Sequence, residues 1–316
     1  MKLSLALATY NEEKNIGDCI ESCRGLAGEV IVVDGTSTDK TVEIAKSLGA
    51  KVVVTSNPSM FHINKQKAID KATGEWILQL DADERVTGEL KEEIKKVIAM
   101  REEELEEYEK NLPDRKLFER HQVLILSRHS DESQNPGVSG SRVGARDDEQ
   151  KTWDDEKTLQ DEKKINAFFI PRLNYFLGKY LCYGGVYPDG VIRLFKKGKA
   201  HLPCKDVHEV MEVEGQIGWL QNPLQHIDSP TFSRYLERNS RYIDYMVQDM
   251  KKLNKEKNLF NFIDYVFIKP MSWFFMTTFR HKGIFDGWQG VVFSFFSALR
   301  FPRAYFRYIN TRKETA

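Results

Sequence analysis

The sequence predicts an α/β fold in which helices flank a mostly parallel β-sheet, followed by a C-terminal helical, aromatic-rich extension. Three observations support this prediction. Short aliphatic or β-branched runs alternate with helical segments over the first hundred residues. Each of these apolar runs ends in polar residues. From residue 231 onward, apolar residues recur at steps of three and four, which is typical of a helix with one buried face.

Four apolar runs are the expected strands of the sheet: residues 3–8, 30–33, 51–55 and 76–80. The clearest helix between them runs from Asp39 to Leu48, with Thr38 as its N-cap and Gly49 beyond its end. This alternation with short loops implies parallel strands joined by right-handed crossovers. Ligands of such sheets bind at the carboxyl ends of the strands, so the polar residues at those ends mark the expected site.

Composition excludes several classes of protein. The chain has 316 residues, 41% of them apolar and 30% charged, so it is neither collagen-like nor wholly disordered. Its 47 basic and 47 acidic residues argue against a nucleic-acid partner. The four cysteines are too scattered for a disulfide scaffold and are expected to be reduced thiols of the core. The short apolar start does not resemble a signal peptide, which favours a cytoplasmic location.

The zero net charge is an average over unlike parts. We expect one domain over residues 1–228, with a charged insertion at about 101–164, and a basic helical region over 229–316. Residues 101–165 hold 12 Lys and Arg against 18 Asp and Glu, a net charge of −6. Only residues 122–126 of this stretch are predicted as a strand; a solvated lid is the functional alternative to a flexible insertion.

Two carboxylates, Asp81 and Asp83, follow the expected strand 76–80 directly. Carboxylates two residues apart at a strand end can share one hard divalent cation, which can neutralise a diphosphate. The alternative is an ordinary acidic turn. A second loop, Asp34-Gly-Thr-Ser-Thr-Asp39, follows the strand 30–33. There Asp34 can accept from a base N–H or a ribose hydroxyl, whereas the alternative is a loop that only caps a helix.

Glycine-rich phosphate loops are absent from the sequence. No GxxxxGK[ST] motif occurs, and no GxGxxG follows a strand. Phosphates must therefore be held by a metal ion and by side chains. Arg193 could pair with a phosphate or with a carboxylate, and the sequence leaves both open. Lys65 and Lys67 lie on the helix before the strand 76–80, where the alternatives are a phosphate contact and a solvated helix face.

These motifs resemble those of a known family. Ala8-Thr-Tyr-Asn-Glu-Glu13, Val32-Val-Asp-Gly-Thr-Ser-Thr-Asp39 and Leu80-Asp-Ala-Asp-Glu84 resemble the family-2 glycosyltransferases, whose GT-A fold is Rossmann-like. Further segments resemble the subgroup of lipopolysaccharide-core glucosyltransferases, which also has a basic aromatic C-terminal region. These segments are Asn174-Tyr-Phe-Leu-Gly178, Gly184-Gly-Val-Tyr-Pro-Asp189, Arg193-Leu-Phe195 and Val207-His-Glu209. The stretch 101–164 departs from that pattern, because the relatives have a shorter link there.

The resemblance implies an inverting transfer of a sugar from a nucleotide-sugar donor, with a UDP-hexose as the best guess, to an acceptor hydroxyl. Thr9, Asn11 and Glu12 would then line the nucleoside pocket, and Asp34 would contact the base. Asp81 would face the ribose and the metal, and Asp83 would be the main metal ligand. Mg²⁺ or Mn²⁺ suits these oxygen ligands and would stabilise the leaving diphosphate.

A one-step inversion needs a single base that takes the proton of the acceptor. Glu209 is the first candidate, because it follows His208 in the segment where the relatives keep His-Glu; the alternative is a surface carboxylate paired with a lysine. Asp189 is the second candidate, against the alternative of a Pro-Asp-Gly turn. His226 is a candidate third metal ligand, although a capping or core histidine is the more ordinary role.

The C-terminal region has two interpretations. Residues 231–316 hold 15 Lys and Arg against 7 Asp and Glu, a net charge of +8, and 21 of the 36 aromatic residues. They could be a helical subdomain that packs on the core, or a peripheral anchor on an anionic membrane surface. We expect a peripheral enzyme of the inner face of the cell membrane, with a role in lipopolysaccharide or cell-envelope biosynthesis. Its acceptor would be a lipid-linked or lipopolysaccharide-core-type glycan.

Three rival functions remain at this stage. The first is a glycosyltransferase that acts on a protein or another polymer. The second is a sugar nucleotidyltransferase, which normally needs a glycine-rich N-terminal loop that Ala8-Thr-Tyr-Asn11 does not supply. The third is an inactive nucleotide-sugar-binding protein of the same fold, and the intact Asp34, Asp81 and Asp83 count against it.

Overall fold

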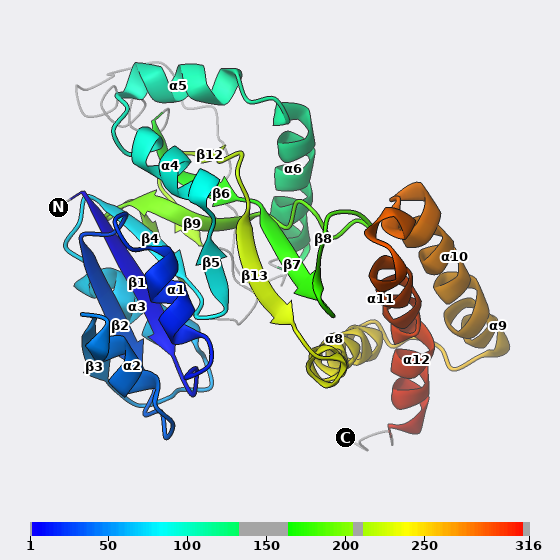
Figure 1. The fold of residues 1–316 in the computed structure, drawn as a ribbon. Coiled ribbons are helices and arrows are strands. Elements are labelled where there is room, and N and C mark those ends of the chain that lie inside the picture. Colours follow the sequence, from blue (N-terminus) through cyan, green and yellow to red (C-terminus); the bar gives the residue numbers. More distant parts are fainter. Residues whose placement is uncertain (1, 133–163, 205–210, 312–316) are drawn as a thin grey trace, which may run out of the picture. The chain divides into compact units, whose positions relative to one another are not determined.

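The computed structural model describes residues 2–132, 164–204 and 211–311. The chain forms two compact units, shown in Figure 1. The first unit contains residues 1–172 and 190–224, and the second contains residues 173–189 and 225–316. The second unit thus begins close to the expected boundary at residue 229 and also takes in residues 173–189, which the sequence assigned to the first domain.

The core of the first unit is a mixed, mostly parallel sheet with the strand order β12-β6-β9-β4-β1-β2-β3. β4, β1, β2 and β3 are parallel, whereas β9 runs antiparallel to its neighbours β4 and β6. The strands are β1 (Leu3–Thr9), β2 (Glu29–Asp34), β3 (Lys51–Val54), β4 (Trp76–Leu80), β6 (Ile165–Ile170), β9 (Val191–Lys196) and β12 (Gln216–Trp219). The predicted α/β class and the expected strands at residues 3–8, 30–33, 51–55 and 76–80 are confirmed.

Helices cover both faces of this sheet. They are α1 (Ile16–Ser22), α2 (Thr41–Ser47), α3 (His62–Lys71), α4 (Gly88–Val97), α5 (Glu102–Lys110) and α6 (Arg115–Glu132). Successive residues of β1 point to opposite faces. Leu5 and Leu7 therefore join one buried cluster with Ile16 of α1 and Ile94 of α4, whereas Ala6 joins another with residues of α3 and α6. This layering holds the strand ends in fixed positions.

Three details of the sequence prediction are wrong. Residues 122–126 were expected to form a strand but lie within α6, which buries Phe118. Helix α2 begins at Thr41 with Lys40 at the N-cap position; the Thr38 hydroxyl donates to Asn11, and Asp39 accepts from the backbone N of Thr41. All four cysteines are free thiols, but Cys182 is exposed rather than part of the core.

The first part of the expected insertion is folded. Leu105 of α5, Phe118 of α6 and Leu112 between these helices are buried in the two clusters of the first unit. Residues 133–163 lie outside the described residues. The remaining strands of this unit are β5 (Glu84–Val86) and the antiparallel pair β10 (Ala200–His201) and β11 (Glu212–Val213).

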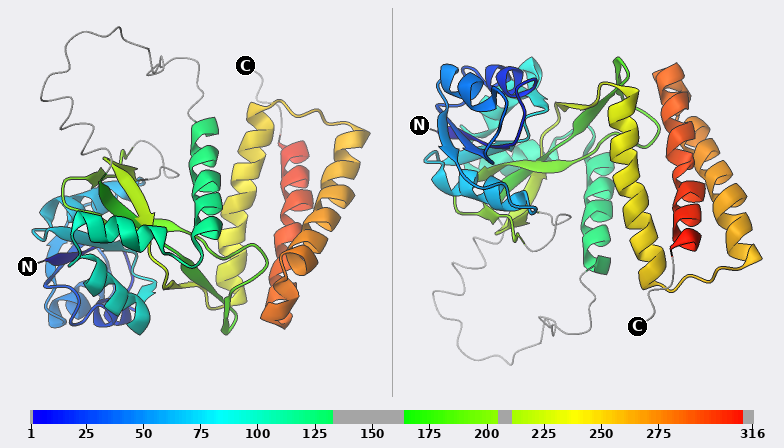
Figure 2. Two further views of the ribbon diagram at one scale, coloured as in Figure 1. Left: turned by 90° about the horizontal axis from the view of Figure 1, so that it is seen from above. Right: turned by 90° about the horizontal axis from the view of Figure 1, so that it is seen from below.

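The second unit joins a small β-structure to a set of helices. Its strands are β7 (Arg172–Phe176), β8 (Lys179–Leu181) and β13 (Leu224–Ser229), and β7 lies between the other two. Its helices are α8 (Phe232–Lys252), α9 (Leu259–Ile263), η1 (Asp264–Ile268), α10 (Lys269–Phe275), η2 (Met276–Arg280), η3 (Gly283–Asp286), α11 (Trp288–Ala298) and α12 (Arg300–Asn310). Figure 2 shows α8, α12 and the segment from α9 to α10 side by side.

Helix α8 carries the predicted amphipathic pattern. Thr231 caps it by accepting from the backbone N–H of Arg234. Its buried stripe contains Tyr235, Asn239, Ile243, Val247 and Met250, at steps of four and three. Ile243, Val247 and Met250 pack with the tyrosines of α12. Among the helices of the described residues, none combines the length and the apolar content needed to cross a membrane.

Candidate functional site

Polar residues of three neighbouring strands meet at one edge of the sheet in the first unit. β1 ends at Thr9 and β2 at Asp34, and these residues are register partners in adjacent parallel strands. On the other side of β1, Leu7 pairs with Leu80 at the end of β4, so Asp81 leaves the sheet at the same edge. The structure therefore brings Thr9, Asp34 and Asp81 to the carboxyl edge at which the sequence places the site.

Asp34 is fully buried, and both of its carboxylate oxygens accept hydrogen bonds. Thr9 Oγ1 donates to Asp34 Oδ1 at 3.0 Å. Ser37 donates twice, from Oγ to Oδ1 at 2.6 Å and from its backbone N to Oδ2 at 2.8 Å. A carboxylate offers about four acceptor positions, so these bonds use most of them. The structural role of Asp34 is to hold the loop after β2 against the end of β1.

The loop after β1 is fastened to the loop after β2. Asn11 has a left-handed backbone with φ 55°, which asparagine tolerates better than most residues. Its backbone N donates to Ser37 Oγ at 2.8 Å, and its Oδ1 accepts from the N of Thr38 at 2.9 Å. The backbone N of Glu12 donates to Thr41 Oγ1 at 2.7 Å. Asn11 and Glu12 thus shape the wall of the edge, and their contact with a nucleoside stays a prediction.

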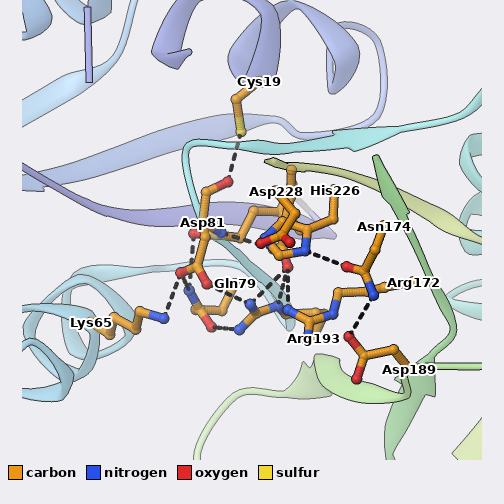
Figure 3. A network of polar contacts seen from close by, with 12 residues as sticks. Cys19, Lys65, Gln79, Asp81, Arg172, Asn174, Asp189, Arg193, His226 and Asp228 are labelled. Atoms are coloured by element: carbon orange, nitrogen blue, oxygen red, sulfur yellow. Dashed lines mark hydrogen bonds and ion pairs between the residues drawn. The ribbon is translucent and has the colours of Figure 1, made fainter. Parts of the chain in front are cut away.

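Two cationic side chains hold the carboxylate of Asp81, as Figure 3 shows. Lys65 Nζ of α3 lies 2.5 Å from Asp81 Oδ1, and Arg193 Nη2 of β9 lies 2.7 Å from Asp81 Oδ2. Burial would raise the pKa of Asp81, but Arg193 and Lys65 hold this pKa well below its usual range. Asp81 is therefore an ionised carboxylate whose charge is already compensated. Lys65 therefore does not belong to a solvated helix face, and a phosphate contact of Lys65 stays a prediction.

Arg193 is the centre of a buried polar network. Its side chain is only 9% exposed, and it donates from Nη1 to Gln79 Oε1 at 2.6 Å and from Nη2 to Glu84 Oε1 at 2.8 Å. The backbone N of Asp81 donates to the other oxygen of Glu84 at 2.9 Å. Arg172 adds a longer contact of 3.4 Å to Glu84. Of the two partners that the sequence left open for Arg193, the structure shows the carboxylate.

Sequence reasoning missed most of this network. Glu84 stands in the motif Leu80-Asp-Ala-Asp-Glu84, directly after Asp83, and this position is the one local signal for it. Gln79 has no local signal, because its contact with Arg193 depends on β9 lying next to β4. Arg172 has none either, because it meets Glu84 across 88 positions of the sequence. Residues 192–195 of β9 are all buried, so alternation along the strand gives no signal for the direction of the Arg193 side chain or for the carboxylates that it meets.

Asp83 lies partly buried in the turn between β4 and β5. Within the described part of the chain, no three His, Cys, Asp or Glu side chains converge into a ready-made metal site. Two carboxylates on one turn nevertheless provide the oxygen ligands that Mg²⁺ and Mn²⁺ prefer, and such ions usually complete their shell with water and substrate phosphates. The carboxylates of this turn therefore fit such an ion, although Lys65 and Arg193 already hold Asp81.

Asp189 and His226 belong to the second unit, where Asn174 connects them (Figure 3). Asn174 Nδ2 donates to Asp189 Oδ2 at 3.1 Å, and Asn174 Oδ1 lies 2.6 Å from His226 Nδ1. An ionised carboxylate only accepts hydrogen bonds, which orients the amide and makes Nδ1 of His226 the protonated ring nitrogen. His226 is buried, as the core-histidine alternative required, and residues 188–190 do not form the Pro-Asp-Gly turn.

Glu209, the first candidate for the base, lies in residues 205–210, outside the described residues. Its role stays a prediction. The roles of Thr9, Asn11, Glu12, Asp34, Asp81, Asp83, Asp189 and His226 toward a ligand likewise stay predictions. The structure supplies their neighbours: an edge formed by Thr9, Asp34 and Asp81 in the first unit, and a hydrogen-bonded group of Asn174, Asp189 and His226 in the second.

Comparisons with known proteins agree with the motifs of the first unit. Residues 4–104 match the model of the family "Glycosyl transferase family 2". An uncharacterized glycosyltransferase of Rickettsia typhi is 42% identical over 99 residues, which is 31% of this chain and 33% of that protein. An uncharacterized glycosyltransferase of Rickettsia bellii is 39% identical over 129 residues, 40% of each chain. The matched stretch thus spans between a third and two fifths of these relatives.

Solved structures give a weaker likeness. Glucosyl-3-phosphoglycerate synthase of Mycobacterium tuberculosis, in complex with Mn²⁺ and UDP-glucose, matches with 26% sequence identity and a TM-score of 0.25. This match covers 27% of this chain and 34% of that chain. The similarity of the present chain to glycosyltransferases therefore rests on the sequence of its N-terminal third.

Proposed function

We propose that this chain is an inverting glycosyltransferase that moves a sugar from a nucleotide-sugar donor to an acceptor hydroxyl. The observation that carries the proposal is the edge formed by β1, β2 and β4. It places the buried Asp34 next to Thr9 in adjacent strands, and brings Asp81, held between Lys65 and Arg193, to the same edge. The match of residues 4–104 to family 2 glycosyl transferases supports this reading.

The donor would bind along this edge. Asp34 has one acceptor position beyond its three hydrogen bonds, and a base N–H is the donor that suits it. Lys65 is paired with Asp81, and its side chain is 12% exposed. Its positive charge can therefore attract a diphosphate that binds next to Asp81. The resemblance of the motifs favours a UDP-hexose, and no side chain identifies the configuration of the sugar.

Asp83 would hold Mg²⁺ or Mn²⁺, with Asp81 beside it. The ion, when bound, supplies Lewis-acid stabilisation of the negative charge on the departing nucleoside diphosphate. Neighbouring residues keep this turn charged and ordered. Lys65 and Arg193 keep Asp81 ionised, and the bond from the backbone N of Asp81 to Glu84 fixes the turn that carries Asp83.

The reaction that we propose has one displacement step. The acceptor oxygen attacks the anomeric carbon, the bond from that carbon to the diphosphate oxygen breaks, and the configuration inverts. A carboxylate of the enzyme takes the proton of the acceptor hydroxyl. Glu209 and Asp189 are the candidates. Of these two candidates, Asp189 lies among the described residues. Asn174 donates to one of its carboxylate oxygens at 3.1 Å.

For the acceptor we propose a lipid-linked or lipopolysaccharide-core-type glycan at the inner face of the cell membrane. This finer proposal is supported by the resemblance of residues 174–195 and 207–209 to the lipopolysaccharide-core subgroup. It is also supported by the basic, aromatic composition of residues 231–316. A transferase that acts on a protein or another polymer is the alternative.

The experiment measures donor binding and slow donor hydrolysis with a panel of nucleotide sugars, with Mg²⁺, with Mn²⁺ and with a chelator. We expect one UDP-sugar to bind in a metal-dependent way and to be hydrolysed slowly. Asp34→Asn is the test variant, and Asp18→Asn, whose side chain is 81% exposed on α1, is the control. If no nucleotide sugar binds to the wild type, the transferase proposal is wrong. Binding without turnover points to an inactive binding protein.

A further inference from the structure

A row of large apolar side chains lies exposed along one face of the segment that runs from α9 to η2. Its members, which we call the outer stripe, are Phe260, Ile263, Phe267, Met271, Phe275 and Phe279. They are between 42% and 75% exposed. Over 19 residues, a helix of ordinary rise makes this stripe about 28 Å long. Surface helices normally turn polar residues outward, so the stripe is an unusual surface.

The backbone keeps the stripe on one face. Its residues follow one another at steps of three and then four. Four residues make slightly more than one turn of an α-helix, which has 3.6 residues per turn. They make slightly less than one turn of the wider π-helix, which closes with i→i+5 bonds. The segment alternates the two types: α9 is followed by the π turn η1, and α10 by the π turn η2. The two deviations therefore offset each other.

The opposite face of the same segment is already in use. Phe262, Tyr265 and Val266 pack on the cluster formed by α8 and α12. Farther along, Trp273 Nε1 donates to Ser297 Oγ of α11 at 3.0 Å, and Thr277 is buried. The orientation of the segment is thus fixed by its own unit. Phe267 and Phe275 of the outer stripe contact Phe262 and Phe274 at their ring edges, but each stripe side chain keeps at least 42% of its surface exposed.

Basic side chains flank the stripe at both ends. Lys257 precedes it, and Arg280 and Lys282 follow it; all three are exposed. The Lys257 ammonium also donates to the backbone carbonyls of Ile309 and Thr311, which neutralise no charge. Asp264, the acidic residue within the stripe's span, is paired with Lys269 at 3.1 Å. Two copies of this face would bring like charges together, whereas an anionic surface would meet them with opposite charge.

A second apolar patch combines residues that follow the stripe along the chain with Tyr183 from the segment after β8. Tyr183, Ile284, Phe285 and Trp288 are exposed there. Asp286 holds the patch together by accepting from the backbone N of Tyr183 at 2.8 Å. The rings of Tyr183 and Phe285 lie 5.9 Å apart. Aromatic rings of this kind are enriched at the interface between water and lipid.

We propose that the outer stripe and this patch bind the surface of an anionic lipid bilayer, with the helix lying in the plane of the interface. The apolar side chains enter the boundary between headgroups and acyl chains, and Lys257, Arg280 and Lys282 meet the anionic headgroups. The inference deepens the proposed function by naming the surface that presents the acceptor. Only the statement that the bound surface presents the acceptor rests on the proposed function; the binding to lipid does not.

Vesicle binding of the full chain tests the proposal without donor or acceptor, so its failure is distinguishable from failure of the proposed activity. The probes are vesicles of phosphatidylglycerol with phosphatidylcholine, and of phosphatidylcholine alone, followed by co-sedimentation. We expect binding to the anionic vesicles that weakens with salt. Phe267→Ser with Phe275→Ser should weaken this binding about tenfold or more.

The matched control is Leu117→Ser with Val123→Ser, two exposed apolar residues on α6 of the first unit, which should bind vesicles like the wild type. Arg280→Glu with Lys282→Glu should remove most of the dependence on anionic lipid. Thermal unfolding checks that each variant is folded. The proposal is overturned if the wild type ignores anionic vesicles at low salt, or if the stripe variant binds them unchanged. It is equally overturned if the stripe drives self-association in the absence of lipid instead.

Discussion

Arg193 and Asp81 form an ion pair at 2.7 Å although 112 positions separate them in the sequence. The pair links β9 to the end of β4, and it is the contact that organises the candidate donor site. Arg193 also serves Glu84 and Gln79 with the remaining donors of its guanidinium. A planar fork with several donors can hold three partners at once, which a lysine cannot do.

Replacing Arg193 with methionine should destabilise the first unit by about 3 kcal/mol, because the buried carboxylate of Glu84 would lose its nearest cation and keep only the longer 3.4 Å contact with Arg172. The free energy of unfolding of Arg193→Lys should lie between those of Arg193→Met and the wild type, since lysine restores the positive charge but not the planar guanidinium with its several donors. Urea unfolding measures both. Arg24→Met is the control, because Arg24 makes an exposed pair with Glu21 and its loss should leave the free energy of unfolding nearly unchanged. Equal stability of Arg193→Met and wild type would contradict the role of the network.

Asp83→Asn should weaken the binding of Mn²⁺ together with UDP about tenfold or more, because Asp83 would give the ion a negatively charged ligand. Thermal unfolding checks that the variant is folded. Calorimetric titration of UDP at several Mn²⁺ concentrations measures this effect. Asp18→Asn, on exposed α1 surface, is the control. If UDP binding by Asp83→Asn still depends on Mn²⁺ as in the wild type, the ion is held by other residues and the proposed role of Asp83 is wrong.

Local sequence patterns predicted the elements that position the donor edge, but not the contacts inside it. The strands that end at Thr9 and Asp34 were predictable because a short apolar run followed by a polar loop is a local signal. The Arg193 network was not, because it depends on β9 running antiparallel between β4 and β6, a pairing between distant parts of the chain.

The error at residues 122–126 has a similar cause. The run Gln-Val-Leu-Ile-Leu favours a strand by composition, but tertiary contacts decide its structure. Phe118 of α6 stacks on Trp219 at a ring distance of 4.7 Å, and Gln122 accepts from Trp219 Nε1 at 3.1 Å. Residues four apart on one helix face therefore contact the same side chain, which a strand could not provide.

Variants of the two candidate bases should separate their roles. If Asp189 is the base, Asp189→Asn keeps donor binding and loses sugar transfer, and Glu209→Gln remains active; if Glu209 is the base, the results are reversed. Sugar transfer to a glycolipid acceptor and donor affinity are measured in parallel. Glu214→Gln, a surface carboxylate paired with Lys199 at 3.0 Å, controls for the loss of a charge. Full transfer by both base variants would exclude both residues.

Asn174 should matter as a positioning residue if Asp189 is the base. Asn174→Ala removes the amide that holds Asp189 at 3.1 Å and His226 at 2.6 Å. We expect kcat to fall by about tenfold while the donor KM stays unchanged, because the donor would bind in the first unit. Asn174→Gln tests whether a longer amide restores part of the rate. An equal rise of KM with an unchanged kcat would indicate a role in binding instead.

Glu29 should make the first unit sensitive to acid. Burial alone would raise the pKa of Glu29, but hydrogen bonds from Ser4 at 2.5 Å and from Thr73 at 2.6 and 2.7 Å lower it from 4.5 to about 2. A folded pKa below the unfolded one stabilises the fold above pH 4.5, and this contribution, about 3 kcal/mol, is lost as the pH falls toward 2.

Glu29→Gln should therefore lower the free energy of unfolding at pH 7, and its difference from the wild type should shrink steadily between pH 5 and pH 3. Urea unfolding across this range measures the difference, with the exposed Glu92→Gln as control; a difference that does not change with pH would show that the loss comes from packing and not from the charge of Glu29.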